Sequence, residues 1–247
     1  MSTRNDWLAN LNRSAPEWGF WGSLGGLAVA ISWGLGMFVI GGVPPIQSVL
    51  EHPIIYRLTF VACFAGPLVE IAVLVALAVL ASQRSPMRAL VGALVALAYV
   101  PLNLSCYFLN GAIQPRLAAT HDFGPIEQTI STILAMEHRY SLYFALDVLG
   151  YGLLGTGLAI MMSALWGRSR LWTWAVAATY LCAFASVAGA IGIFLDSQRL
   201  TNACVIGGIF AIASSCLTAA AFRLEHPTAV ATECPPVAPG EIVAPAP

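Results

Sequence analysis

Long apolar runs separated by short polar turns dominate the chain. A helix needs about 20 mostly apolar residues to cross a bilayer. The runs lack the two-residue alternation of barrel strands, and in lipid only helices and closed barrels satisfy their backbone hydrogen bonds. The pattern therefore predicts an all-α bundle of six transmembrane helices, at residues 19–42, 56–81, 88–110, 142–166, 171–195 and 203–222.

The segments around this six-helix domain (residues 19–223) are polar or rich in proline. Residues 1–18 are polar and are predicted to form a cytoplasmic N-terminal segment. Residues 224–247 are rich in Pro, Ala and Val and are predicted to be a disordered cytoplasmic tail. In the longest outer segment, Pro125–Glu137 carries its apolar residues largely along one side, which predicts a short interfacial helix.

Arginine placement indicates the orientation of the bundle, because cytoplasmic loops carry an excess of basic residues. With a cytoplasmic N-terminus, the inner segments carry Arg4, Arg13, Arg84, Arg88, Arg168, Arg170 and Arg223. The outer segments carry Arg57, Arg116, Arg139 and Arg199. The inner loops are also shorter, so this asymmetry predicts that both termini are cytoplasmic.

Composition supports the membrane assignment and excludes several functions. Hydrophobic residues make up 58% of the 247 residues and charged residues 9%, against about 25% charged in soluble domains. All basic residues are Arg, which excludes lysine-based chemistry such as a retinal Schiff base. The net charge of −1, without an arginine cluster, gives no nucleic-acid footprint. The expected partner is the lipid bilayer, not nucleic acid.

Two patterns resemble cofactor or metal chemistry but lack its context. The sequence GYGLLG at residues 150–155 has the spacing of a dinucleotide fingerprint, which needs a preceding strand. Inside an apolar helix, such glycines are typical of close helix packing, so no cofactor is expected. His52, His121 and His138 lie in outer segments beside carboxylates, but no H-x-x-x-H spacing supports a zinc site. We interpret them as solvated side chains, with a pH response through His52 and His138 as the alternative.

The intramembrane polar residues are the best functional candidates. Glu70 lies near the centre of the second predicted span, one turn after Pro67, and an acid at the midplane costs about 3 kcal/mol on insertion scales. Asp147 is the second acid within a span. Further polar residues share one face of the third span (Tyr99, Asn103, Cys106, Asn110) and of the fourth (Tyr140, Tyr143, Asp147, Tyr151).

Most of this polar material falls in the outer half of the membrane, whereas the inner halves of the second and third spans are aliphatic. The pattern predicts an outward-facing polar pocket for a small ligand or a lipid. Its predicted lining is Glu70, Asp147, Asn103, Tyr107 and Tyr151, with Arg57 and Arg139 at the mouth. Tyr140 and Tyr143 near a span end are equally typical of an interfacial aromatic belt, and Asn103 of helix–helix hydrogen bonding.

The chain resembles an uncharacterised group of prokaryotic six-helix membrane proteins, a domain of unknown function. The resemblance covers residues 19–223 and rests on HPIIYRLTF and on DVLGYGLLGTGLAIMMSALWGRSRLWTWA, in which a glycine-rich span ends in a basic turn. It implies the six-helix fold and a prokaryotic plasma membrane, and it implies no activity.

Three functions remain open from the sequence. The favoured one is a non-enzymatic membrane protein that binds a small ligand or senses conditions in the outer pocket. The alternatives are a proton-coupled transporter, suggested by Glu70 beside Pro67, and an intramembrane enzyme that acts on a lipid or isoprenoid through Glu70 and Asp147. Glycine-lined faces on the first, fourth and sixth spans serve either internal packing or oligomerisation.

Overall fold

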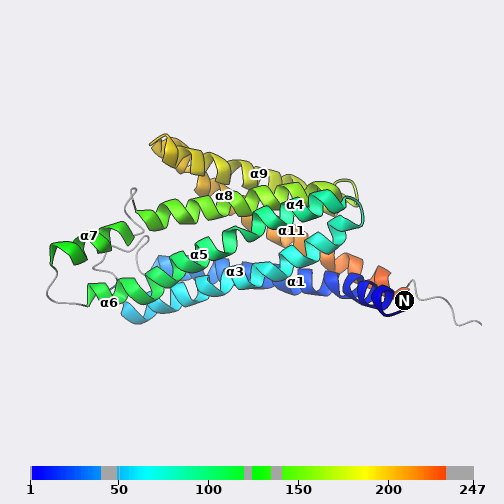
Figure 1. The fold of residues 1–247 in the computed structure, drawn as a ribbon, viewed down its shortest axis with the longest axis horizontal. Helices are drawn as coiled ribbons and strands as arrows, with labels where there is room; N and C mark the ends of the chain where they lie inside the picture. Colours follow the sequence, from blue (N-terminus) through cyan, green and yellow to red (C-terminus); the bar gives the residue numbers. More distant parts are fainter. Residues whose placement is uncertain (1, 40–48, 50, 120–123, 135–140, 232–247) are drawn as a thin grey trace, which may run out of the picture.

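The computed structural model describes residues 2–39, 49, 51–119, 124–134 and 141–231, and every regular element in this part of the chain is helical (Figure 1). The long helices are α1 (Ser2–Val39), α3 (Pro53–Ser82), α8 (Leu142–Met162), α9 (Arg170–Phe194) and α11 (Ala203–Ala231). The shorter elements are α4 (Pro86–Leu97), α5 (Tyr99–Phe108), the π-helical turn η1 (Leu109–Ile113), α6 (Gln114–Ala118), α7 (Pro125–Leu134), the 3₁₀ turn η2 (Ser163–Leu165) and α10 (Gln198–Thr201).

The described helices confirm a membrane protein. Five stretches are long and apolar enough to cross a membrane, and each contains or closely matches one of the last five predicted spans. They are Pro53–Ser82, Pro86–Leu117, Leu142–Leu165, Arg170–Phe194 and Gln198–Leu224. Helix α1 contains nearly all of the first predicted span and packs along α3 and α11. The chain is therefore an all-α bundle with five to six helices suited to spanning.

The helices pack in a ring that follows the order of the chain. α1 contacts α3, α3 contacts α4 and α5, these contact α8, α8 contacts α9, and α9 contacts α11, which returns to α1. The start of α1 and the end of α11 lie at the same end of the bundle as the α3–α4 and α8–α9 turns (Figure 1). We call this the arginine end, because both turns carry only arginines as charged residues.

Two predicted boundaries differ from the structure, and one predicted helix is confirmed. Residues 2–18 are not a separate segment, since they form the first half of α1, and Ala15 in that half joins the core. The tail prediction is wrong for residues 224–231, which continue α11, while 232–247 lie outside the described residues. The predicted helix at Pro125 is confirmed as α7, which ends at Leu134 in the described part.

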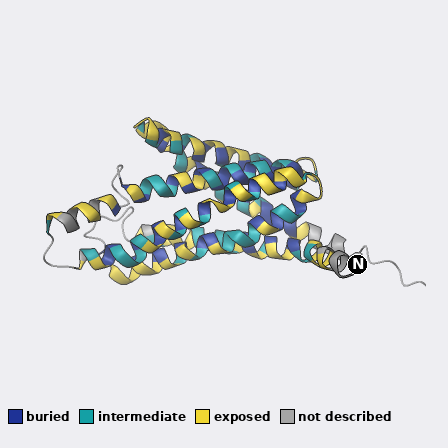
Figure 2. Ribbon diagram, viewed as in Figure 1, coloured by how far each residue is buried: buried dark blue, intermediate teal, exposed yellow. Residues whose placement is uncertain are grey.

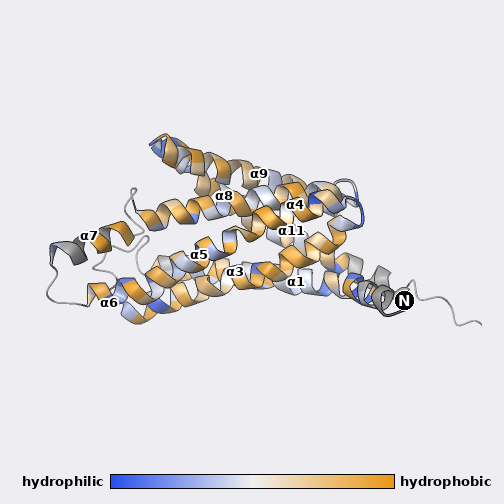
Figure 3. Cartoon of the chain, viewed as in Figure 1, coloured by the Kyte–Doolittle hydropathy of each residue, from blue (hydrophilic) through white to orange (hydrophobic). Residues whose placement is uncertain are grey.

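The core divides into two clusters along the length of the bundle. At the arginine end, Leu74, Leu77, Met161 and Trp172 belong to an extended apolar cluster. At the other end, aromatic side chains and cysteines pack between α3, α5 and α8. Large apolar residues are exposed along the outside of the bundle, and hydrophilic residues gather near its ends (Figures 2 and 3). This distribution is the one expected when lipid, not water, surrounds the helices.

The glycines of the GYGLLG stretch serve helix packing, as predicted. A Cβ atom on Gly155 would meet Ala183 of α9 at 2.9 Å. Two residues further along α8, a Cβ on Gly157 would collide with the backbone of Gly92 and Ala96 in α4. The absent side chains therefore allow α8 to pack closely against both neighbouring helices. By contrast, Gly26, Gly34 and Gly208 have no atom within 4 Å of such a Cβ, so faces of α1 and α11 remain open and oligomerisation stays a prediction.

Candidate functional site

The third span is interrupted where its polar residues lie. Pro101 has no N–H to donate to the carbonyl of Leu97, four residues earlier, and helix α4 ends at Leu97. Helix α5 then begins at Tyr99, and the π-helical turn η1 follows it and buries Asn110. Such interruptions are common at functional sites in helices. They set the rotation of α5, which presents Tyr99, Asn103 and Tyr107 to the interior.

Asn103 is the centre of a hydrogen-bonded network between α5 and α8. Its side chain is fully buried, and its Nδ2 donates to Oδ1 of Asp147 at 2.8 Å and to the hydroxyl of Tyr107 at 3.2 Å. The Tyr107 hydroxyl also lies 2.7 Å from that of Tyr151. Four of the residues predicted to line one pocket are therefore joined by direct hydrogen bonds.

Glu70 of α3 joins the same network through Tyr99. The Tyr99 hydroxyl is the hydrogen-bond partner of the Glu70 carboxyl. The ring of Tyr99 also packs against that of Tyr151, with 5.4 Å between their centroids. The two acids thus reach one cluster, Glu70 through Tyr99 and Asp147 through Asn103. We call Glu70, Tyr99, Asn103, Tyr107, Asp147 and Tyr151 the polar core.

Gly150 makes room for the polar core. A Cβ atom at this position would collide with Oδ1 of Asn103 and would lie 3.3 Å from the ring of Tyr99. The glycine therefore lets two polar side chains of α5 lie flat against α8. This role of Gly150 was not part of the predicted site, because its contact partner on α5 cannot be identified from the GYGLLG spacing alone.

A second layer of polar side chains lies between the polar core and the end of the bundle opposite the arginine end. The Tyr56 hydroxyl donates to Oδ1 of Asn110 at 3.1 Å, and Nδ2 of Asn110 donates to the Cys106 carbonyl at 3.3 Å. Tyr143, which the sequence placed equally well in an aromatic belt, is only 1% exposed and packs against Phe60. The belt interpretation is wrong for Tyr143, because packing turns its ring inward.

Some buried polar atoms in this region have no hydrogen-bond partner. They include Oε2 of Glu70, Oδ1 of Asn103 and the hydroxyl of Tyr143. Buried polar atoms are usually paired with protein or with ordered water, and each exception calls for an explanation. The two oxygens of Glu70 and Asn103 are acceptors, so a group that satisfies them must donate a hydrogen bond or carry positive charge.

The remaining predicted site residues lie away from the polar core or outside the described residues. Arg57 is exposed on α3, thirteen residues before Glu70, which is about 20 Å along a helix. No arginine among the described residues acts on either acid. Arg139, at the predicted mouth, lies outside the described residues.

The histidines give no metal site that the structure describes. His52 is exposed, and no group of three or more His, Cys, Asp or Glu suited to a metal ion occurs in the described ranges. His121 and His138 lie outside those ranges.

The polar core is closed toward the end opposite the arginine end but reaches the side of the bundle. Tyr99, Asn103 and Tyr107 are at most 5% exposed, and Tyr56 and Phe60 cover the side away from the arginine end. Glu70 and Asp147 are half-buried, and Tyr151 is 37% exposed on the outside of the bundle. Two cavities of about 480 and 530 Å³ lie elsewhere on the bundle. Entry of a ligand from that end therefore requires the layer of Tyr56, Phe60 and Tyr143 to move, whereas Tyr151 can be reached from the side of the bundle.

No family model, curated protein or solved structure matches the chain. The resemblance drawn from the sequence stays a prediction.

Proposed function

We propose that this protein is a six-span plasma-membrane protein, with both termini cytoplasmic, that senses conditions on the outer side through its polar core. The expected ligand is a proton or a small cation. The observation that carries the proposal is that Glu70 and Asp147 meet one buried network whose unpartnered oxygens are acceptors. No cation among the described residues compensates these acids.

Protonation would change the hydrogen bonding of such a network. An ionised carboxylate only accepts hydrogen bonds, whereas a protonated carboxyl also donates one. Asp147 accepts from Asn103, and Asn103 in turn contacts Tyr107. A proton gained or lost at Asp147 therefore requires Tyr107 and Tyr151 to rearrange their hydroxyl groups, which links the charge of the core to the packing of α5 against α8.

Thermal unfolding in lipid nanodiscs between pH 5 and 8 tests this proposal. We expect the unfolding temperature of the unmodified protein to depend on pH, and Glu70→Gln and Asp147→Asn to flatten that dependence. Both changes keep the side-chain shape and remove the titrating proton. Glu51→Gln is the matched control, because Glu51 is exposed. An unchanged pH dependence in both core variants, or an equal flattening by Glu51→Gln, would refute the proposal.

Proton-coupled transport is the second candidate, and the interruption of the third span favours it. Discontinuous helices form the ion sites of many transporters, and the break between α4 and α5 lies at Tyr99, the partner of Glu70. The aliphatic core at the arginine end gives this candidate no polar exit path in the present conformation. In proteoliposomes, transport would give a solute flux that follows an imposed pH gradient and is lost in Asp147→Asn. A flux indifferent to the gradient would count against it.

A further inference from the structure

A groove on the outside of the bundle lies between α8 and α9, on the arginine-end side of the polar core. Its volume is about 480 Å³, and its apolar lining includes Ala159, Ile160, Ala183, Phe184 and Val187. Phe184 is 77% exposed and Val187 36%, so the groove faces the surroundings of the bundle, not its interior. Within a membrane these surroundings are the acyl chains of lipids.

Arg88 of α4 closes the groove at the arginine end. Its guanidinium lies 3.5 Å from the Ser163 hydroxyl, which also lines the groove. Ser163, at the start of η2, comes seven positions after Thr156 of α8, so the groove extends about 10 Å along the helix away from Arg88. The length of the groove is about one third of the 30 Å thickness of the hydrocarbon core. The groove has a cation at one end and an apolar lining along the rest.

The charged residues of the two turns at this end of the groove are all arginines. Arg84, Arg88, Arg168 and Arg170 lie in or beside the α3–α4 and α8–α9 turns, and residues 71–121 and 148–195 contain no Asp or Glu. Arg84 bonds to the Trp166 carbonyl at 3.4 Å and Arg88 to Ser163, and both partners are neutral. The charges of Arg84 and Arg88 are therefore not neutralised by these two partners.

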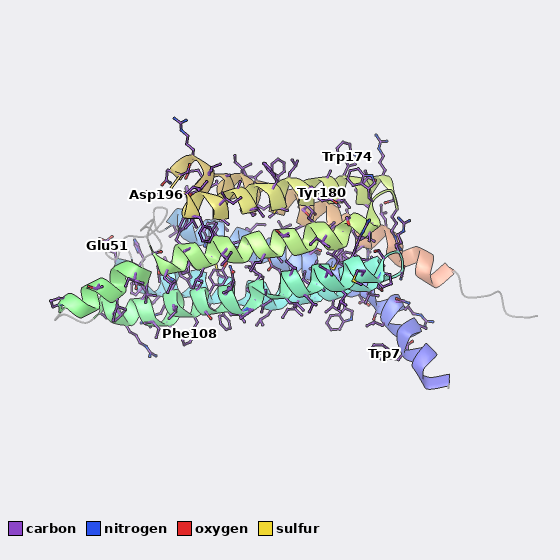
Figure 4. All side chains as sticks on the ribbon, turned by 45° about the horizontal axis from the view of Figure 1, so that its top comes forward. Trp7, Glu51, Phe108, Trp174, Tyr180 and Asp196 are labelled. Carbon is purple, nitrogen blue, oxygen red and sulfur yellow. The ribbon has the colours of Figure 1, made fainter. Side chains whose placement is uncertain are left out.

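The aromatic residues nearby mark the level of the membrane surface. Trp166 and Trp174 are 53% and 58% exposed at the arginine end, and tryptophan is enriched where headgroups meet hydrocarbon. Figure 4 shows Trp174 and Tyr180 on α9 near this end, and Tyr180 lines the groove. Arg88 thus lies where a lipid phosphate would be, and the apolar lining where its acyl chain would be.

We propose that this arginine-headed groove binds an anionic phospholipid. A guanidinium binds phosphate oxygens through two parallel hydrogen bonds, a geometry that lysine lacks. Basic pockets between transmembrane helices are the usual sites for anionic headgroups. The excess of arginines in these turns also orients the protein in the membrane. That role does not explain why Arg88, inside helix α4, reaches across to Ser163 of α8 at the head of an apolar groove.

Titration of the purified full-length protein with defined lipids tests the proposal. The measurement is the unfolding temperature in mild detergent, with added phosphatidylglycerol or phosphatidylcholine. We expect phosphatidylglycerol to raise it by several degrees at concentrations where phosphatidylcholine and glycerol phosphate do not. Equal responses to the two phospholipids, or a full response to glycerol phosphate, would overturn the proposal.

Variants of Arg88 assign the effect to the groove. Arg88→Gln should weaken the apparent affinity for phosphatidylglycerol at least tenfold, and Arg88→Lys should weaken it less, because it keeps the charge but loses the forked geometry. Arg199→Gln makes the same charge change on an exposed residue at the opposite end of the bundle and should leave the affinity unchanged. Should Arg88→Gln fail to fold, Arg88→Lys still decides, because an unchanged affinity in either variant would overturn the assignment.

Discussion

Tyr107 and Tyr151 contact each other through their hydroxyl groups, yet the structure predicts unequal costs for removing them. The Tyr107 hydroxyl lies 2.7 Å from that of Tyr151, accepts from Asn103 at 3.2 Å and is a hydrogen-bond partner of Asp147. The hydroxyl of Tyr151 bonds only to Tyr107 among the described contacts. Substitution by Phe removes only the hydroxyl in each case, so the ring packing of Tyr151 on Tyr99 is kept.

The difference can be estimated from these contacts. Hydrogen bonds between helices in membranes contribute about 0.6 kcal/mol each on average, and up to about 1.7. Tyr151→Phe removes one bond and leaves Tyr107 with two partners, so we expect a loss of about 0.6 kcal/mol. Tyr107→Phe removes three bonds and leaves the Tyr151 hydroxyl without its partner, so we expect a loss of about 2 kcal/mol. The double variant should cost no more than Tyr107→Phe alone, because their shared bond is then counted once.

Reversible unfolding in mixed micelles, followed by tryptophan fluorescence, measures these free energies. Trp172 is fully buried against Phe222 and is a suitable reporter of the core. Tyr180→Phe is the control, because Tyr180 is 43% exposed and lies outside the polar core. A Tyr151→Phe loss equal to or larger than that of Tyr107→Phe, or strictly additive losses in the double variant, would refute the network as described.

Three further predictions concern the packing of the helices and the orientation of the bundle. Gly150→Ala should destabilise the protein by about 1–3 kcal/mol through overpacking against Asn103. Gly208→Ala should be neutral or stabilising by up to about 1 kcal/mol, because no described atom lies within 4 Å of the added Cβ. Both variants are measured in the same unfolding assay, and equal effects would contradict the packing. Thr179→Val should cost about 1 kcal/mol by removing the 2.6 Å hydrogen bond to Ser214 that joins α9 to α11, more than Thr173→Val, whose hydroxyl is exposed. A reporter domain that is active only in the cytoplasm should be active when fused to either terminus. A reporter that is active only after export should be inactive at both ends, and its activity at either end would overturn the orientation.

The positions of the spans could be predicted from the sequence because lipid leaves the chain few alternatives. Apolar runs of about 20 residues must be helical when no water is present to satisfy the backbone. The ends of the first and last helices could not be predicted in the same way. Residues 2–18 and 224–231 are polar or mixed, and they continue α1 and α11 beyond the apolar runs.

The members of the polar core could be predicted only in part. The shared face of Tyr99 and Asn103 follows from helical spacing, as does that of Asp147 and Tyr151. Which faces meet depends on the rotation of each helix, and that rotation is set by contacts such as Gly150 with Asn103 and Gly157 with Ala96. Tyr143 shows the limit most clearly. Its position in the first turn of α8 fits a membrane surface, but its ring packs on Phe60 inside the bundle.

The energetics of the polar core argue for a role beyond holding the helices together. Glu70, near the centre of its span, costs about 3 kcal/mol on insertion scales, and Asp147, in the second turn of α8, adds a smaller cost. The sum is a large part of the whole stability of many domains. The hydrogen bonds that reach the two acids, from Asn103 and Tyr107 to Asp147 and from Tyr99 to Glu70, contribute about 0.6 kcal/mol each and offset about 2 kcal/mol of this cost. Apolar residues at positions 70 and 147 would therefore give a more stable bundle, as the neighbouring cluster around Leu74 and Leu77 illustrates. Stability alone does not account for the pair, and the uncompensated part of their cost is the physical ground for our proposal that Glu70 and Asp147 take part in sensing.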